Sequence, residues 1–82
     1  MKNIDITVKY FGVIAEITQK DQEVIKLQED QKTQDLQKKL LGQYPNLKDS
    51  VFQIALNQQL TNSNKTLQHL DEIALLPPFA GG

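Results

Sequence analysis

The stretch TQDLQKKLLGQY, residues 33–44, is the longest segment of this chain with a helical repeat of apolar side chains. Its apolar residues are spaced so that they share one face of a helix: Leu36, Leu40, Leu41 and Tyr44. Thr33 is expected to begin the helix, with its hydroxyl capping free backbone N–H groups, and Pro45 is expected to end it. The chain therefore has one substantial helix of about three turns, which can cover one face of a sheet.

Strand-like patterns lie on both sides of this helix. Before it, residues 4–10 and 23–27 alternate between apolar and polar side chains, which is typical of half-buried strands. After it, residues 51–56 and 73–76 are predicted to be strands, with a short fourth strand at residues 60–61. The last strand is continuously apolar, which indicates a central place in the sheet. One short helical turn is expected between the first two strands, where Val13, Ile14 and Ile17 have helical spacing.

This order of elements predicts a two-layer α+β domain, with a mixed sheet of four to five strands packed on one main helix. A single helix covers only one face of the sheet, so the other face is expected to stay partly apolar and available. Strand parity places Phe11, Leu60 and Leu76 on that open face. They predict a docking surface for a protein partner.

Composition excludes several classes of function. The 82 residues are expected to form one domain, too small for a deep active-site pocket. The absence of cysteine excludes a disulfide scaffold, a thiolate metal site and a cysteine nucleophile. A net charge of −1 without any arginine disfavours nucleic acid as a partner. No apolar run reaches the roughly 20 residues that cross a bilayer, and the first residues lack a signal-peptide pattern, so a cytoplasmic location away from membranes is expected.

The sequence PPFAGG, residues 77–82, follows the last strand and divides the chain into a folded domain, residues 1–76, and an extended tail. Two consecutive prolines end the hydrogen-bond ladder of a strand and favour extended backbone, so the tail is expected to leave in a defined direction. Gly81 and Gly82 have no side chain to obstruct a narrow channel. Phe79 is the large side chain that can anchor the tail in a partner's groove. A diglycine terminus of this kind offers an unhindered carboxylate to another enzyme.

The run DEIALLPPFAGG, residues 71–82, resembles the C-terminal signature of molybdopterin synthase small subunits. Other parts are similar to the same family: Tyr10-Phe11-Gly12 at the end of the first strand, Glu16-Ile17 after it, and Ala55-Leu56-Asn57 before a turn. The resemblance extends over essentially the whole chain. It implies a ubiquitin-like β-grasp fold.

The resemblance also implies a chemistry for the tail. The carboxylate of Gly82 would be adenylated by an ATP-dependent, ubiquitin-activating-type adenylyltransferase and then converted to a thiocarboxylate. The tail would enter the large catalytic subunit of a heterotetrameric molybdopterin synthase, which uses the sulfur to build the dithiolene of molybdopterin from cyclic pyranopterin monophosphate. The chain would be the sulfur-donor subunit rather than the catalytic one, with no bound cofactor or metal.

The resemblance assigns roles to two sets of residues. Gly82 carries the adenylate and the thiocarboxylate, with Gly81 beside it. The residues expected to contact the partner lie in the tail and on the open face: Pro78, Phe79, Ala80, Phe11, Leu60 and Leu76. Two positions differ from the family pattern, because Leu70 stands where glycine is usual and Ala15 stands where arginine is frequent.

Two other functions fit the same sequence. One is a sulfur carrier of the thiamin thiazole type, although the double proline and the length favour the first interpretation. The other is a protein modifier or interaction module whose diglycine is joined to lysine. The remaining polar candidates are interpreted as surface groups: His69 as a loop residue, and Asp71 with Glu72 as a turn entering the last strand.

Overall fold

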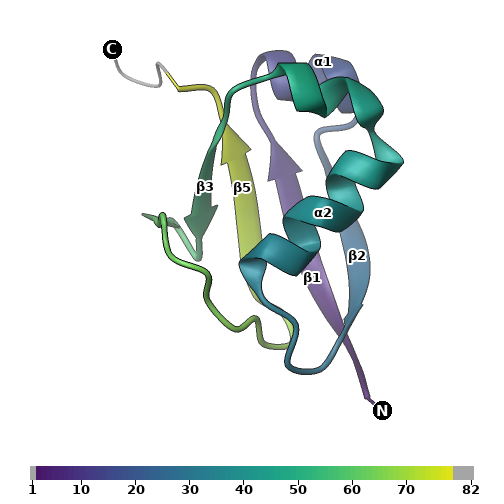
Figure 1. The fold of residues 1–82 in the computed structure, drawn as a ribbon, viewed down its shortest axis with the longest axis vertical. Coiled ribbons are helices and arrows are strands. Elements are labelled where there is room, and N and C mark those ends of the chain that lie inside the picture. Colours follow the sequence, from purple (N-terminus) through teal and green to yellow (C-terminus); the bar gives the residue numbers. More distant parts are fainter. Residues whose placement is uncertain (1, 79–82) are drawn as a thin grey trace.

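The computed structural model describes residues 2–78 and shows a five-stranded sheet with the longer helix across one face (Figure 1). In chain order the elements are β1 (Asn3–Tyr10), α1 (Val13–Thr18), β2 (Gln22–Gln28), α2 (Thr33–Gln43), the 3-10 helix η1 (Pro45–Asp49), β3 (Gln53–Leu56), β4 (Gln59–Leu60) and β5 (Glu72–Leu76). The predicted α+β class with one main helix is confirmed. The 3-10 helix that begins at Pro45 was not predicted.

The sheet has the strand order β2-β1-β5-β3-β4, so the first and last strands lie side by side near its middle. These two strands are parallel, whereas the pairs β1–β2, β3–β5 and β3–β4 are antiparallel. The prediction that the last strand is central is confirmed. Because β1 and β5 run in the same direction, both end at the edge of the sheet near α1 (Figure 1).

The core lies between the sheet and α2. Alternate residues of β1 are buried, as the predicted alternation requires: Ile4, Ile6, Val8 and Tyr10. From α2, Leu36 and Leu40 fill the other side of the core, and Leu41 and Tyr44 pack against its border. The predicted helix face is therefore confirmed. Leu67 is also buried, although it lies in an irregular polar segment where no periodicity indicated its role.

The N-terminus of α2 is capped differently from the prediction. Thr33 is the first helical residue, and its hydroxyl accepts a hydrogen bond of 3.2 Å from the backbone N–H of Lys65 instead of capping its own helix. The free N–H of Gln34 is satisfied by Oδ1 of Asn64, at 3.0 Å. Asp35 accepts the N–H of Lys32 at 2.8 Å. The cap thus comes largely from a loop 30 residues away in sequence, which local pattern does not reveal.

The third and fourth strands are shorter than or displaced from the predicted ranges. β3 begins at Gln53 rather than at Val51, whose side chain is exposed. β4 comprises Gln59 and Leu60, one residue earlier than expected. The predicted inward face of the third strand is nevertheless correct, because Phe52, Ile54 and Leu56 pack against the core.

Candidate functional site: the tail exit and the open sheet face

The exit of the tail is built where β1 and β5 end together. Tyr10 pairs with Leu75, and the N–H of Phe11 continues the ladder with a bond of 3.2 Å to the carbonyl of Leu75. Pro77 follows without an N–H to donate, so the ladder stops there. Pro78 is the last described residue and is partly buried. The predicted stop of the sheet at the double proline is therefore observed.

The tail residues predicted to carry the chemistry and to enter the partner lie outside the described residues. These are Phe79, Ala80, Gly81 and Gly82. Their roles stay predictions. The structure describes the strand end and the two prolines, Pro77 and Pro78, that precede them.

The open face of the sheet has an apolar half and a charged half. The strand register sets Lys9, Ala74, Ala55 and Leu60 side by side across β1, β5, β3 and β4. On β1 and its neighbours, ion pairs cover the face, with Nζ of Lys9 lying 3.2 Å from Oε1 of Glu72 and Nζ of Lys26 lying 3.6 Å from Oδ1 of Asp5. The apolar half therefore begins at Ala74 of β5, beyond the ion pair of Glu72, and continues over Ala55 of β3 and Leu60 of β4.

The three predicted docking residues lie on this open face or at its end. Leu60 is 63% exposed and Phe11 is 44% exposed, which is high for side chains of this size. Leu76 is partly buried and has the opposite parity to the core residues Ile73 and Leu75. Phe11 and Leu76 follow the paired residues Tyr10 and Leu75, so they belong to the same end of the sheet as the tail exit. Their docking role stays a prediction.

Sequence reasoning missed two small residues in the same face. Ala55 and Ala74 are directly paired across β3 and β5. Their position between Lys9 on one side and Leu60 on the other places them at the centre of the open face. Ala74 alternates with the buried Ile73 and Leu75, and Ala55, itself only 5% exposed, lies between Ile54 and Leu56, which pack against the core.

The turn before β5 keeps an unusual geometry at Leu70, where the related family has glycine. Leu70 has a φ of +73° and is 74% exposed. Its N–H donates a hydrogen bond of 2.8 Å to the carbonyl of Asp5. A left-handed backbone is easy for glycine and costs a residue with a Cβ about 1–2 kcal/mol. The turn at Leu70 therefore carries backbone strain.

The other polar candidates take part in structural contacts. Asp71 accepts the N–H of Gln68 at 2.8 Å, which makes it a turn residue as expected. Glu72 forms the ion pair with Lys9 already described. His69 accepts the N–H of Asp5 at Nδ1, at 3.0 Å, and so holds its loop against β1. Ala15, the second departure from the family, packs against the core from α1.

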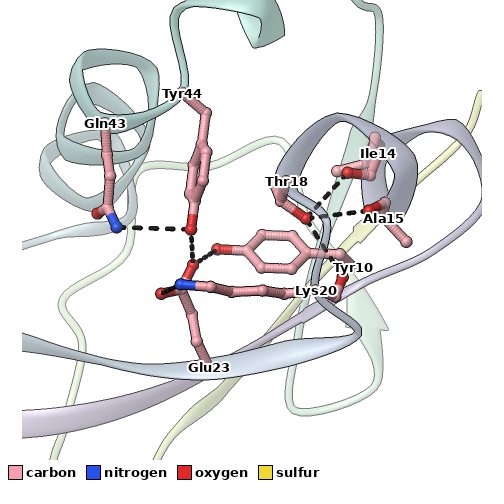
Figure 2. Close-up of polar contacts among 8 residues, drawn as sticks. All are labelled: Tyr10, Ile14, Ala15, Thr18, Lys20, Glu23, Gln43 and Tyr44. Carbon is pink, nitrogen blue, oxygen red and sulfur yellow. Dashed lines mark hydrogen bonds and ion pairs between the residues drawn. The ribbon is translucent and has the colours of Figure 1, made fainter.

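A partly buried polar cluster on the helix side was not predicted (Figure 2). The hydroxyls of Tyr10 and Tyr44 each donate a hydrogen bond of 2.5 Å to Oε2 of Glu23, and Nζ of Lys20 lies 3.2 Å from Oε1. Burial favours the neutral carboxyl, but the hydrogen bonds from Tyr10, Tyr44 and Lys20 favour the charged form, and the net effect lowers the pKa of Glu23. Burial and the bond to Glu23 raise the pKa of both tyrosines.

Two further observations concern the kind of site. Within residues 2–78, no three His, Asp or Glu side chains come together in a way that could hold a metal ion. The helices of the described chain are too short and too polar to cross a bilayer.

The model of the ThiS family matches residues 8–82, which is nearly the whole chain. The chain belongs to the ThiS family. Within it, this ThiS-family chain is similar to the molybdopterin synthase sulfur carrier subunit of Arabidopsis thaliana, with 30% identity over 98% of this chain and 85% of that protein. The predicted resemblance to molybdopterin synthase small subunits is confirmed.

Solved structures agree with this assignment. The putative molybdopterin converting factor, subunit 1, from Pyrococcus furiosus superposes with a TM-score of 0.86 at 24% identity, covering 92% of this chain and 98% of that one. This likeness confirms the predicted ubiquitin-like β-grasp fold. A chain in the protein–protein complex of subunits 1 and 2 of molybdopterin-converting factor from Helicobacter pylori is 30% identical to this one. It superposes with a TM-score of 0.70, covering 96% of this chain and 100% of that one.

Proposed function

We propose that this chain is the sulfur carrier of a molybdopterin synthase and so serves molybdenum cofactor biosynthesis. The observation that carries the proposal is its 30% identity, over nearly its full length, with a molybdopterin synthase sulfur carrier subunit. The strand end at Pro77, with the diglycine Gly81-Gly82 beyond it, supports the same function.

The proposed activation takes place at the carboxylate of Gly82. A carboxylate is a poor electrophile, so one of its oxygens attacks the α-phosphate of ATP on an adenylyltransferase, and pyrophosphate leaves. Hydrosulfide, or an equivalent sulfur nucleophile at the same oxidation level, then attacks the acyl adenylate, and AMP leaves. The product is a thiocarboxylate. We propose that these steps take place in the cytoplasm, where ATP is available.

The proposed transfer takes place in the large subunit. The thiocarboxylate sulfur attacks a carbon of the pterin precursor and forms a thioester, with loss of the group that it displaces. Water then cleaves the acyl carbon–sulfur bond, so the sulfur stays on the substrate and the Gly82 carboxylate is restored. A dithiolene contains two sulfur atoms, so one product consumes two charged carriers.

The proposed docking uses the open face and the tail together. Phe11, Leu60 and Leu76 offer apolar surface that α2 does not cover. Pro78, Phe79 and Ala80 are proposed to line the entry of the tail into the large subunit. The H. pylori complex of subunits 1 and 2 supports a large subunit as the partner, because a chain of that complex is 30% identical to this one.

The test is a mass measurement on the intact chain. The purified chain is incubated with the adenylyltransferase of the same organism, ATP and sulfide, beside a chain that lacks Gly82. We expect the full-length chain, but not the chain that lacks Gly82, to exchange one oxygen for sulfur. We expect this change to be reversed when the large subunit and the pterin precursor are added. Charging without transfer to that precursor would favour a carrier of the thiamin type. Conjugates to lysine would indicate a protein modifier.

A further inference from the structure

Gly12 and Pro77 meet at the point where the two central strands end. Gly12 follows β1 and Phe11, whereas Pro77 follows β5 directly. Because the two strands are parallel and adjacent, the residues after them lie at the same edge of the sheet. This contact is therefore formed between the start of α1 and the first residue of the tail.

The contact has room only for glycine. Gly12 has a φ of +58° and a ψ of −133°, a backbone conformation that residues with a Cβ rarely adopt. A Cβ built on Gly12 would lie 2.8 Å from Cγ of Pro77, inside the 3.0 Å that real Cβ atoms essentially never cross. Any side chain at this position therefore requires one of the two partners to move.

Pro77 is the partner that can move. Gly12 is held on one side by the ladder bond from the N–H of Phe11 to Leu75, and on the other by its own carbonyl, which accepts the N–H of Glu16 in α1. That helix is fixed in the core by Ile14, which is completely buried. Pro77 lies beyond the last ladder bond and donates none of its own.

We propose that Gly12 is a positioning residue, which sets the direction in which residues 78–82 leave the domain by letting Pro77 lie against its backbone. This inference rests on the proposed function of the tail. Any five residues held extended, as in a narrow channel, span at most about 17 Å, so a rotation of about 10° at their base moves the far end by about 3 Å. A displacement of about 1 Å at a reacting atom can cost about 100-fold in rate.

The direct test measures the tail direction without any sulfur chemistry. The chain has no cysteine, so Ala80→Cys gives a single site for a nitroxide spin label. Relaxation enhancement of the amide protons of β1, α1 and β3 then reports where the label lies. Gly12→Ala is expected to change this pattern, whereas Gly42→Ala, whose added methyl meets no atom within 4 Å, is expected to leave it unchanged. An unchanged pattern in folded Gly12→Ala would overturn the proposal.

The functional test is a double-mutant cycle between Gly12→Ala and Pro77→Ala. Each chain is prepared chemically as its thiocarboxylate and mixed with excess large subunit and pterin precursor for a single turnover. Gly12→Ala is expected to slow transfer about tenfold or more in the natural background, but less than about twofold when the proline ring has been removed. The strain of a positive φ lowers the melting temperature in both backgrounds, so stability alone cannot reproduce this difference.

The outcomes separate this inference from the proposed function. Equal slowing by Gly12→Ala in both backgrounds, or no slowing in either, would show that Gly12 does not act through Pro77. If Gly12→Ala does not fold, Pro77→Ala alone still tests the contact, because it must change the relaxation pattern of the label. A different result would count against the proposed function instead. In it, the thiocarboxylate of the natural sequence transfers no sulfur, while Gly12→Ala still changes the relaxation pattern of the spin label as expected.

Discussion

The hydroxyl of Tyr10 donates a hydrogen bond of 2.5 Å to Oε2 of Glu23, on the neighbouring strand β2. The same oxygen accepts the hydroxyl of Tyr44, which follows α2 and whose ring meets that of Tyr10 edge to face at 6.1 Å. One carboxylate thus joins two strands and the main helix through charge-assisted bonds, which are stronger than neutral ones. The cluster lies at the border of the core, where it fixes the end of α2 against the sheet (Figure 2).

This cluster predicts a specific dependence of stability on pH. The pKa of Glu23 is lowered in the folded state, so its contribution is fully present above the unfolded value and is lost as the pH falls through the folded value. Glu23→Gln is expected to cost about 1–3 kcal/mol at neutral pH and to reduce the acid loss of stability below about pH 4.5. Urea unfolding at a series of pH values checks this. Parallel pH profiles for the two proteins would contradict the assignment.

The strained backbone at Leu70 predicts that glycine at this position increases the stability of the fold. Leu70→Gly removes the cost of a left-handed backbone, about 1–2 kcal/mol, but adds freedom to the unfolded chain worth about 0.4–1 kcal/mol. A net gain of about 0.5–1 kcal/mol is expected, because the side chain is largely exposed and little apolar burial is lost. Leu70→Ala is the control, since it shortens the side chain and keeps the strain. Equal unfolding free energies for the two variants would count against the strain.

The buried face of α2 predicts a large loss of stability when one of its side chains is truncated. Leu40 is 2% exposed at the centre of α2, so Leu40→Ala is expected to lower the unfolding free energy by about 2–5 kcal/mol through lost burial and the cavity that remains. Lys38→Ala, on the exposed face of the same helix, is expected to change it by less than about 0.5 kcal/mol. Denaturant titration of both variants measures the contrast. A small change at Leu40 would mean that the core relaxes around the cavity.

The elements that could be predicted from the sequence are those encoded by local repeats. Alternation of apolar and polar residues located β1 and its buried face, and the spacing of Leu36 and Leu40 located the face of α2. The stop at Pro77 follows from covalent chemistry, because proline cannot donate to a ladder. Each of these signals is contained within a dozen residues, so it can be recognised in the sequence before the fold is known.

The features that escaped prediction all depend on contacts between distant segments. Asn64 caps the helix that begins at Thr33, and Tyr44 meets Glu23 only after the helix has crossed the sheet. The close contact of Gly12 with Pro77 requires the parallel pairing of the first and last strands, which no local pattern contains. Capping by Thr33 was the wrong prediction because Thr33 is the first helical residue, one position after the N-cap Lys32, and its hydroxyl accepts the N–H of Lys65.

The open face predicts a separation between binding and stability. Phe11→Ala and Leu76→Ala are expected to weaken binding to the large subunit more than they lower the melting temperature, because truncating an apolar side chain near the centre of an interface costs more than about 1 kcal/mol of affinity where that side chain is a hot spot. Val24→Ala is a matched control, since Val24 is 60% exposed and pairs with Thr7 on the same face but over the other half of the sheet. Isothermal titration calorimetry measures the affinity, and scanning calorimetry measures the melting temperature. Loss of stability with unchanged affinity would place Phe11 and Leu76 in the core.

The tail predicts a loss of chemistry without a loss of fold. Deleting Gly82, or adding one residue after it, moves the carboxylate from the position at which the adenylyltransferase and the large subunit meet it. Sulfur transfer is expected to vanish, while the unfolding free energy stays within about 0.5 kcal/mol, because the described core is formed entirely by residues before Pro77. Gly81→Ala is expected to bind well and to transfer slowly, since an added methyl restricts the backbone next to the reacting atom.

Phe79→Ala separates anchoring from chemistry within the same tail. The loss of its ring is expected to weaken affinity, so excess large subunit restores much of the rate, which it does not do for Gly81→Ala. Single-turnover transfer from chemically prepared thiocarboxylates, measured over a range of large-subunit concentrations, distinguishes the two. Because the thiocarboxylate is installed chemically, a defect in adenylation cannot produce the result. Full activity from a chain that ends at Gly81 would remove Gly82 from the mechanism.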